Sequence, residues 1–282
     1  KRLSNNEVDI VFGTHAIFQK KVIFNNLGLI IIDEQHKFGV KQRKKLSDKG
    51  GKNCDVLVMS ATPIPRTMIM TVIGDIDTSI IKNKPKNRKE IKTYSKLESK
   101  TEEVIEFVKK QINQKNQVFW VCPLIDESKK VDHQSSVKRY EGLKKIFKNK
   151  VGLIHGALEK DEKNNILLKF LNKEIDILVS TTVIEVGIDF PNANIIIIEN
   201  ANKFGLSQLH QLRGRVGRGN KESYCILMFK SNLSDNAKKR INILKESNDG
   251  FFISEEDMKI RGFGDILGFK QSGIKNFKLA DP

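Results

Sequence analysis

Small hydroxyl and carboxylate side chains follow several short apolar runs of this 282-residue sequence. Three such runs are followed by Asp33 and Glu34, by Ser60 to Thr62, and by Ser180 to Thr182, and a fourth is followed by His155 and Gly156. Parallel α/β sheets bind ligands outside the carboxyl ends of their strands. The pattern therefore predicts that these side chains gather where phosphate chemistry would take place. The alternative at any single position is a helix cap, because Ser, Thr and Asp also cap helices that follow strands.

Three arginines, Arg213, Arg215 and Arg218, lie close together between glycines, although Lys is the usual cation in this chain. The planar guanidinium fork of Arg suits phosphate oxygens better than the ammonium group of Lys does. We therefore expect this segment to bind phosphate. The alternative is a solvated basic loop.

The elements that must position these residues are indicated by the hydrophobic pattern. Apolar runs of strand length cover residues 8–12, 27–32, 56–59, 118–121, 151–154, 175–179 and 195–198. Continuous apolar strands imply a sheet that is covered on both faces. Residues 101–112 and 162–171 place apolar side chains at helical spacing. The alternation of strands and helices predicts parallel α/β structure.

The length and the polar stretch of residues 82–92 predict more than one domain. We expect domains at residues 1–85 and 86–230, followed by a C-terminal region of residues 231–282. In that region, Ser254 with Asp257 three positions later predicts a helix start.

The composition and charge of the chain indicate which kinds of partner it can bind. The formal net charge of +16 and the pI of about 9.6 indicate a polyanionic partner, although scattered Lys in a Lys-rich chain is an equally good explanation. No apolar run approaches the roughly 18 residues that a membrane span needs, so no membrane partner is expected. The 3 cysteines are far apart in apolar runs, which predicts free thiols and a cytoplasmic location.

The segment DEQH at residues 33–36 resembles the Walker B box of a DExH helicase. The resemblance implies that Asp33 binds Mg²⁺ through water and that Glu34 orients or deprotonates the attacking water. The segment SAT at residues 60–62 resembles the helicase motif that links the nucleotide site to the nucleic-acid site. A coupling role is therefore implied for four residues: His36, Ser60, Ala61 and Thr62.

The segment QLRGRVGRG at residues 211–219 matches the arginine-finger motif of superfamily 2 helicases. By this resemblance Gln211, Arg215 and Arg218 serve the γ-phosphate of ATP. Residues 181–189 resemble a segment that contacts nucleic-acid backbone through Thr181 and Thr182 and nucleotide through Gly187 and Asp189. The segment GTHA resembles another backbone-contacting loop, which implies DNA contacts at Thr14 and His15.

The branch of the superfamily is indicated by longer segments. Residues 33–43 and 61–67 are similar to the RecG family and to the transcription-repair coupling factors. Residues 249–273 resemble the translocation motif that both share, which implies a coupling role for Arg261 and Gln271, although Phe263 stands where the pattern usually has Pro. Residues 118–128 favour the RecG family.

The resemblance implies two RecA-like parallel-sheet domains, the first incomplete, followed by a helical hairpin and loop. It further implies an ATP- and Mg²⁺-dependent DNA helicase, monomeric, that remodels branched or duplex DNA in fork regression, recombination and repair. No G-x-x-x-x-G-K-[ST] loop occurs in the 282 residues, so we expect the chain alone not to hydrolyse ATP. The alternatives are a coupling-factor translocase that acts on RNA polymerase and a non-catalytic basic module that binds nucleic acid.

Overall fold

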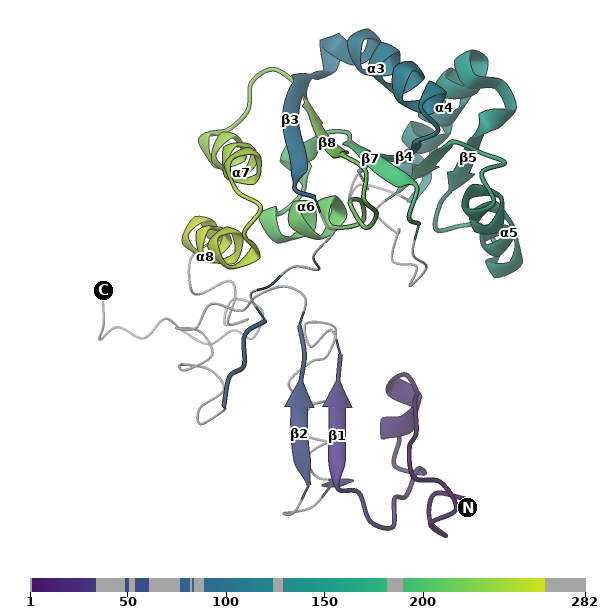
Figure 1. The fold of residues 1–282 in the computed structure, drawn as a ribbon, viewed down its shortest axis with the longest axis vertical. Coiled ribbons are helices and arrows are strands. Elements are labelled where there is room, and N and C mark those ends of the chain that lie inside the picture. The colour runs from purple at the N-terminus through teal and green to yellow at the C-terminus, as the bar shows by residue number, and fades with distance from the viewer. Residues whose placement is uncertain are drawn as a thin grey trace. The chain divides into compact units, whose positions relative to one another are not determined.

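The computed structural model describes residues 2–33, 49–50, 54–60, 77–81, 83, 89–123, 129–181 and 190–261. The chain forms two compact units, Lys1–Ile64 and Pro65–Pro282. Their elements are labelled in Figure 1. Because residues 61–76 lie outside the described ranges, the domain boundary near residue 85 stays a prediction.

The first unit contains two parallel strands, β1 (Leu29–Ile32) and β2 (Asp55–Val58), and the short 3₁₀ helix η1 (His15–Phe18). Ile30 and Ile32 are buried on one face of β1, whereas Leu29 and Ile31 on the other face are more than half exposed. An apolar strand face of this kind normally packs against another layer.

The prediction of a strand at residues 8–12 is wrong, because this segment is irregular. Ile10 is 72% exposed and Phe12 is 93% exposed. A strand needs a neighbouring strand to satisfy its backbone N–H and C=O groups. No described strand pairs with residues 8–12.

The second unit is built on a parallel six-stranded sheet in the order β3-β8-β7-β4-β6-β5. Its strands are β3 (Ile91–Leu97), β4 (Gln117–Val121), β5 (Val151–Ile154), β6 (Ile177–Ser180), β7 (Ala193–Ile198) and β8 (Ser223–Phe229). Every residue of β4, β6 and β7 is buried, as expected for parallel strands covered on both faces. The four apolar runs between residues 118 and 198 are thus confirmed as strands.

Strand β3 was not predicted, because it begins inside the stretch that was expected to be a linker. It reads Ile-Lys-Thr-Tyr-Ser-Lys-Leu, and most of its side chains are exposed or half-buried. An edge strand is covered less completely than a central strand, so its sequence looks polar. β8, its partner, was also missed.

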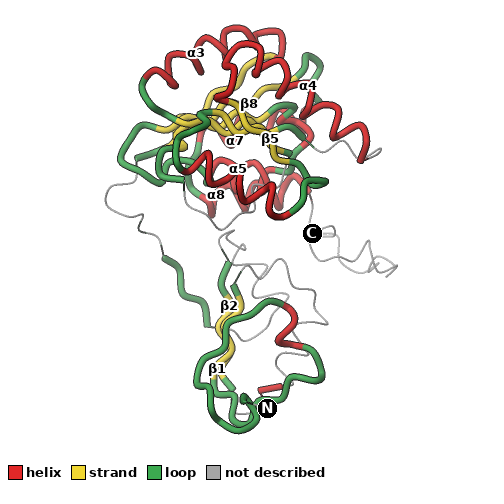
Figure 2. The backbone as a smooth tube through the Cα atoms, turned by 90° about the vertical axis from the view of Figure 1, so that its right-hand side faces the viewer, coloured by secondary structure: helices red, strands yellow, loops and turns green. Residues whose placement is uncertain are grey.

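Helices cover both faces of this sheet, as Figures 1 and 2 show. The helices α3 (Thr101–Asn113) and α4 (Lys129–Phe147) pack on one face, where Val104, Val108 and Leu143 share a core with Trp120. The other face carries α5 (Lys160–Leu171), α6 (Leu206–Arg213), α7 (Asp235–Glu246) and α8 (Gly250–Arg261). The 3₁₀ helices are η3 (Glu98–Lys100), η4 (Lys148–Lys150) and η5 (Ala201–Lys203). The helices predicted at residues 101–112 and 162–171 are confirmed.

The predicted helix start at Ser254 is wrong, since α8 begins at Gly250. The carboxylate of Asp249 accepts a hydrogen bond of 2.8 Å from the Phe251 N–H and so satisfies a free donor of the first turn. Asp257, which was expected in the first turn, lies in the interior of the sequence of α8, and its side chain is buried. The capping signal therefore lies five residues earlier than the pattern suggested.

Among the described residues, no helix combines the length and the apolar character that crossing a membrane requires. Cys54, Cys122 and Cys225 are free thiols, as predicted. Burial raises the pKa of the Cys225 thiol to about 12, so the reactive thiolate is disfavoured there.

Candidate nucleotide and nucleic-acid site

In the first unit, two predicted site residues emerge from neighbouring strands. Asp33 follows β1 directly and is exposed, and Ser60 follows β2 after one residue and is exposed too. The Met59 N–H donates to the Ile32 carbonyl at 2.8 Å, which extends the ladder to the ends of both strands. A carboxylate and a hydroxyl therefore share one strand edge, and such oxygen ligands suit Mg²⁺ and phosphate chemistry. Glu34, His36, Ala61 and Thr62 lie outside the described residues.

In the predicted DNA-contacting loop near the start of the chain, Gly13 lies close to the side chain of Ile17. A Cβ added to Gly13 would lie 2.4 Å from Ile17 Cγ2, so no side chain fits at Gly13. Thr14 is exposed and extended, and its side chain does not cap η1. The Thr14 hydroxyl is thus available to a ligand, while only the backbone of His15 is described.

At the carboxyl edge of the second sheet, Thr181 follows β6 and is 3% exposed. Its N–H donates to the Ile154 carbonyl at 3.3 Å, which ties the end of β6 to β5. A DNA contact by this side chain would require the residues that cover it to move. Thr182, Gly187 and Asp189 lie outside the described residues, so the contacts expected in this segment stay predictions.

The arginine motif begins on α6, which follows β7 on the face opposite α3. The Gln208 side chain accepts a 3.0 Å hydrogen bond from the Gly205 N–H at the helix start. Leu209 and Leu212 are buried in the core, and this anchoring leaves Gln211 half-buried on the same helix. The buried side chains of Leu209 and Leu212, which precede and follow Gln211 in the sequence, therefore determine its position.

Arg213 was not predicted as a site residue, and the structure shows that its role differs from that of the other two arginines. It is 2% exposed. Its guanidinium donates to the carbonyl oxygens of Leu244 at 2.6 Å and Ser247 at 2.9 Å, to Thr93 Oγ1 at 3.3 Å, and to His210 Nδ1 at 3.2 Å. Burial lowers the pKa of this guanidinium. Arg213 thus caps the carboxyl end of α7, where helix carbonyls lack partners within the helix.

Arg215 and Arg218 lie beyond α6 in a loop that two glycines hold in place. Gly217 has a φ of +76°, which favours glycine. A Cβ on Gly219 would lie 2.9 Å from the Pro191 carbonyl oxygen, so the loop packs against the end of the segment that leads from Asp189 into β7. The arginine loop therefore packs against Pro191, whereas Gly187 and Asp189, the predicted nucleotide contacts, lie outside the described residues.

Arg215 and Arg218 differ in how far their side chains are exposed to solvent. Arg215 is half-buried, and its side chain makes no hydrogen bond or ion pair within the part of the chain that the structure describes. Arg218 is exposed. One motif therefore contains a guanidinium that donates to protein acceptors, Arg213, and another for which the described residues supply no acceptor, Arg215.

Hydrogen bonds connect the C-terminal helices α7 and α8 to α6 and to the residue before it. Ser207 Oγ on α6 donates to the buried Asp257 carboxylate on α8. Arg240 on α7 donates to the Phe204 carbonyl at 2.8 Å, just before α6 begins. Arg261 is the last residue of α8, and Gln271 lies outside the described residues. These bonds give a physical link between the arginine motif and the helix that leads into the predicted coupling segment.

Comparison with known proteins places this arrangement in a class. The family model described as a DEAD/DEAH box helicase matches residues 1–71, and the helicase conserved C-terminal domain matches residues 99–220. The solved structure of Saccharomyces cerevisiae Dbp5 L327V bound to RNA and ADP BeF3 has a TM-score of 0.58 and 15% identity, and the match covers 88% of this chain and 66% of that chain. The fold and the arginine motif define a superfamily 2 helicase motor with RecA-like domains.

The ATP-dependent DNA helicases RecG of Bacillus subtilis and Thermotoga maritima are each 50% identical to the chain, over 100% and 99% of its length. The chain belongs to the RecG family. A solved structure of RecG bound to a three-way DNA junction matches with a TM-score of 0.73 and 46% identity, over 99% of this chain and 35% of that chain. The chain spans 41% and 36% of the lengths of the two curated relatives.

Proposed function

We propose that the whole protein containing this chain is an ATP-dependent DNA helicase that remodels branched DNA in fork regression, recombination and DNA repair. The match of nearly every residue of this chain to proteins named RecG supports this function over that of a coupling factor. The junction-bound relative supports branched DNA as the substrate. We also propose that the protein acts as a monomer in the cytoplasm.

ATP and Mg²⁺ would supply the free energy of phosphate hydrolysis. Asp33, at the carboxyl end of β1, would hold the ion through water, and Glu34 would orient the attacking water. Gln211, Arg215 and Arg218 would engage the γ-phosphate, while Gly187 and Asp189 would contact the nucleotide. DNA backbone would be contacted by Thr14, His15, Thr181 and Thr182.

The observation that carries this proposal is the contrast between two arginines of one motif. The guanidinium of Arg213 donates to protein carbonyl groups, whereas Arg215 is half-buried and its side chain has no partner among the described residues. A partly desolvated guanidinium without an acceptor is unfavourable unless a ligand supplies one. A phosphate group would do so with the bidentate geometry that Arg favours.

The test replaces Arg215 and Arg218 separately by Lys in the whole protein. We expect DNA-stimulated ATP hydrolysis to fall by about tenfold to a thousandfold in each variant, because Lys keeps the charge but loses the planar fork. Arg2→Lys, an exposed change outside the motif, is the matched control and should hydrolyse ATP normally. Normal hydrolysis in both motif variants would show that these positions are only solvated cations.

A second experiment tests the coupling role that is proposed for the C-terminal segment. Arg261→Ala and Gln271→Ala should leave ATP hydrolysis largely intact while fork remodelling falls sharply, because α8 is bonded to α6 through Asp257. Both activities are measured on one preparation. A parallel loss of the two activities would contradict a coupling role.

A further inference from the structure

The strand β5 lies at one end of the six-stranded sheet and faces a groove. Among the described strands it pairs with β6 alone. The groove has a volume of about 490 Å³ and is lined by residues of α4, β5 and α5. The helices α4 and α5 cover opposite faces of the sheet (Figures 1 and 2). A groove that residues of both helices and of β5 line therefore follows the edge of β5.

The groove offers backbone and apolar side chains together. An edge strand presents N–H and C=O groups that another strand can pair with. Apolar lining side chains come from both sides of the edge, with Val151 and Leu153 on β5, Leu158 before α5, and Ile166 on α5. This combination suits an extended segment whose main chain pairs with β5 while alternate side chains contact the walls.

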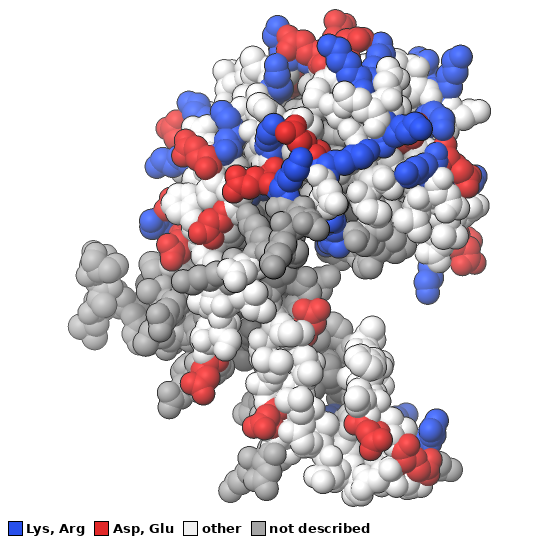
Figure 3. Space-filling view, viewed as in Figure 1, with Lys and Arg blue, Asp and Glu red and all other residues white. Residues whose placement is uncertain are grey.

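The rim of the groove is basic. Lys144 of α4 and Lys169 of α5 line it from opposite sides, and among the described residues neither has a carboxylate within ion-pair distance. Lys144 Nζ lies 5.5 Å from the Tyr140 ring centroid, which holds the ammonium group near the groove. Glu174 is the one acidic lining residue. Figure 3 shows basic side chains gathered over α4 and β5 on the visible face.

We propose that this groove, the β5 groove, binds an extended peptide segment of a partner protein with alternating acidic and apolar residues. The segment adds as a strand to β5, and its carboxylates meet Lys144 and Lys169. Nucleic acid fits less well, because stacking of bases needs free aromatic faces. Two aromatic rings line the groove: Tyr140 already contacts Lys144, and His155 is half-buried. A second copy of β5 fits less well too, since its rim would bring like charges together.

The test uses a fluorescein-labelled octapeptide of alternating Asp and Val as the probe, added to the 282-residue chain. Fluorescence anisotropy measures binding, and hydrogen exchange measures protection of the backbone amides of residues 151–154. The Lys144→Glu/Lys169→Glu double variant should bind the probe about tenfold more weakly, because two attractive contacts become repulsive.

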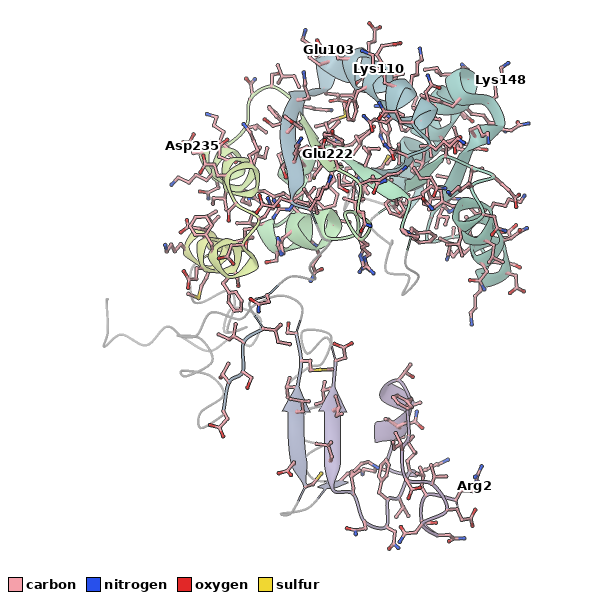
Figure 4. All side chains as sticks on the ribbon, in the orientation of Figure 1. Arg2, Glu103, Lys110, Lys148, Glu222 and Asp235 are labelled. Carbon is pink, nitrogen blue, oxygen red and sulfur yellow. The ribbon has the colours of Figure 1, made fainter. Side chains whose placement is uncertain are left out.

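The matched control is Lys110→Glu/Lys245→Glu. These two lysines also lie in the last turns of their helices, α3 and α7, and do not line the groove. Figure 4 shows Lys110 on α3. The control should change binding by less than about twofold. A probe with Lys in place of Asp, or with Pro in place of Val, should not bind.

Protection gained at residues 151–154 together with selective weakening by the groove variant supports the proposal. Equal weakening by the two double variants, or binding without protection of β5, overturns it. Displacement of the peptide by a single-stranded octanucleotide would assign the groove to nucleic acid instead. Dimerisation of the chain through β5 without peptide, measured by sedimentation, would assign the groove to a second copy.

Discussion

The substitution Arg213→Lys removes a buried guanidinium fork and keeps the charge. Arg213 makes four hydrogen bonds, two of them to the carbonyl oxygens of Leu244 and Ser247 at the end of α7. The ammonium group of Lys has a single nitrogen on a shorter reach, so it cannot engage all four acceptors together. At least one α7 carbonyl should lose its donor in the protein interior.

The expected loss of stability follows from that count. A buried acceptor without a donor costs about 1–3 kcal/mol, and the weaker Thr93 and His210 contacts are lost in addition. We therefore expect the free energy of unfolding to fall by about 3 kcal/mol. For a domain of about 150–250 residues, this corresponds to a fall in Tm of roughly 6–12 °C.

The assay is thermal and denaturant unfolding of the chain, with Arg215→Lys as the matched control. Arg215 lies two residues away and has no partner in the described part of the chain, so its replacement should change stability by less than about 0.5 kcal/mol. Equal unfolding midpoints for the two variants would refute the capping role of Arg213.

Two further predictions concern stability. Gly217→Ala should lower the free energy of unfolding by about 1–2 kcal/mol, because the φ of +76° at this position is unfavourable for a residue with a side chain. Gly142→Ala on α4 should raise it by about 0.5–1 kcal/mol, because no atom lies within 4 Å of the added Cβ. Denaturant midpoints that move in the same direction for the two variants would contradict this prediction. Burial raises the pKa of the Asp176 carboxyl, with Lys150 at 3.8 Å opposing the shift, so ionisation of Asp176 costs stability as the pH rises through that pKa. The free energy of unfolding of Asp176→Asn should therefore exceed that of the native chain at pH 7 by up to about 1 kcal/mol. This difference should disappear below about pH 3, where Asp176 is protonated. A difference that stays constant between about pH 3 and pH 7 would exclude titration of Asp176 as its cause.

The central strands of the second unit could be predicted from the sequence, because strands covered on both faces are mostly apolar, and β4, β6 and β7 are buried throughout. The edge strand β3 could not, since partial cover permits polar residues that look like a linker. The segment at residues 8–12 is apolar but not a strand, because apolar character alone does not supply a pairing partner. Apolar runs therefore identified the partly exposed strands β1 and β2 as well as the central strands, and missed β3 and β8.

The arginine-glycine motif could also be recognised from the sequence, because its residue types and spacing are unusual in a Lys-rich chain. The separate roles of its arginines could not, since Arg213 and Arg215 have the same chemistry two positions apart. The acceptors that occupy Arg213 belong to Leu244 and Ser247, about thirty residues further along the chain. Only the packing of α7 against α6 brings those carbonyl groups to one guanidinium and leaves the other without an acceptor among the described residues, because hydrogen-bond partners are determined by position in space.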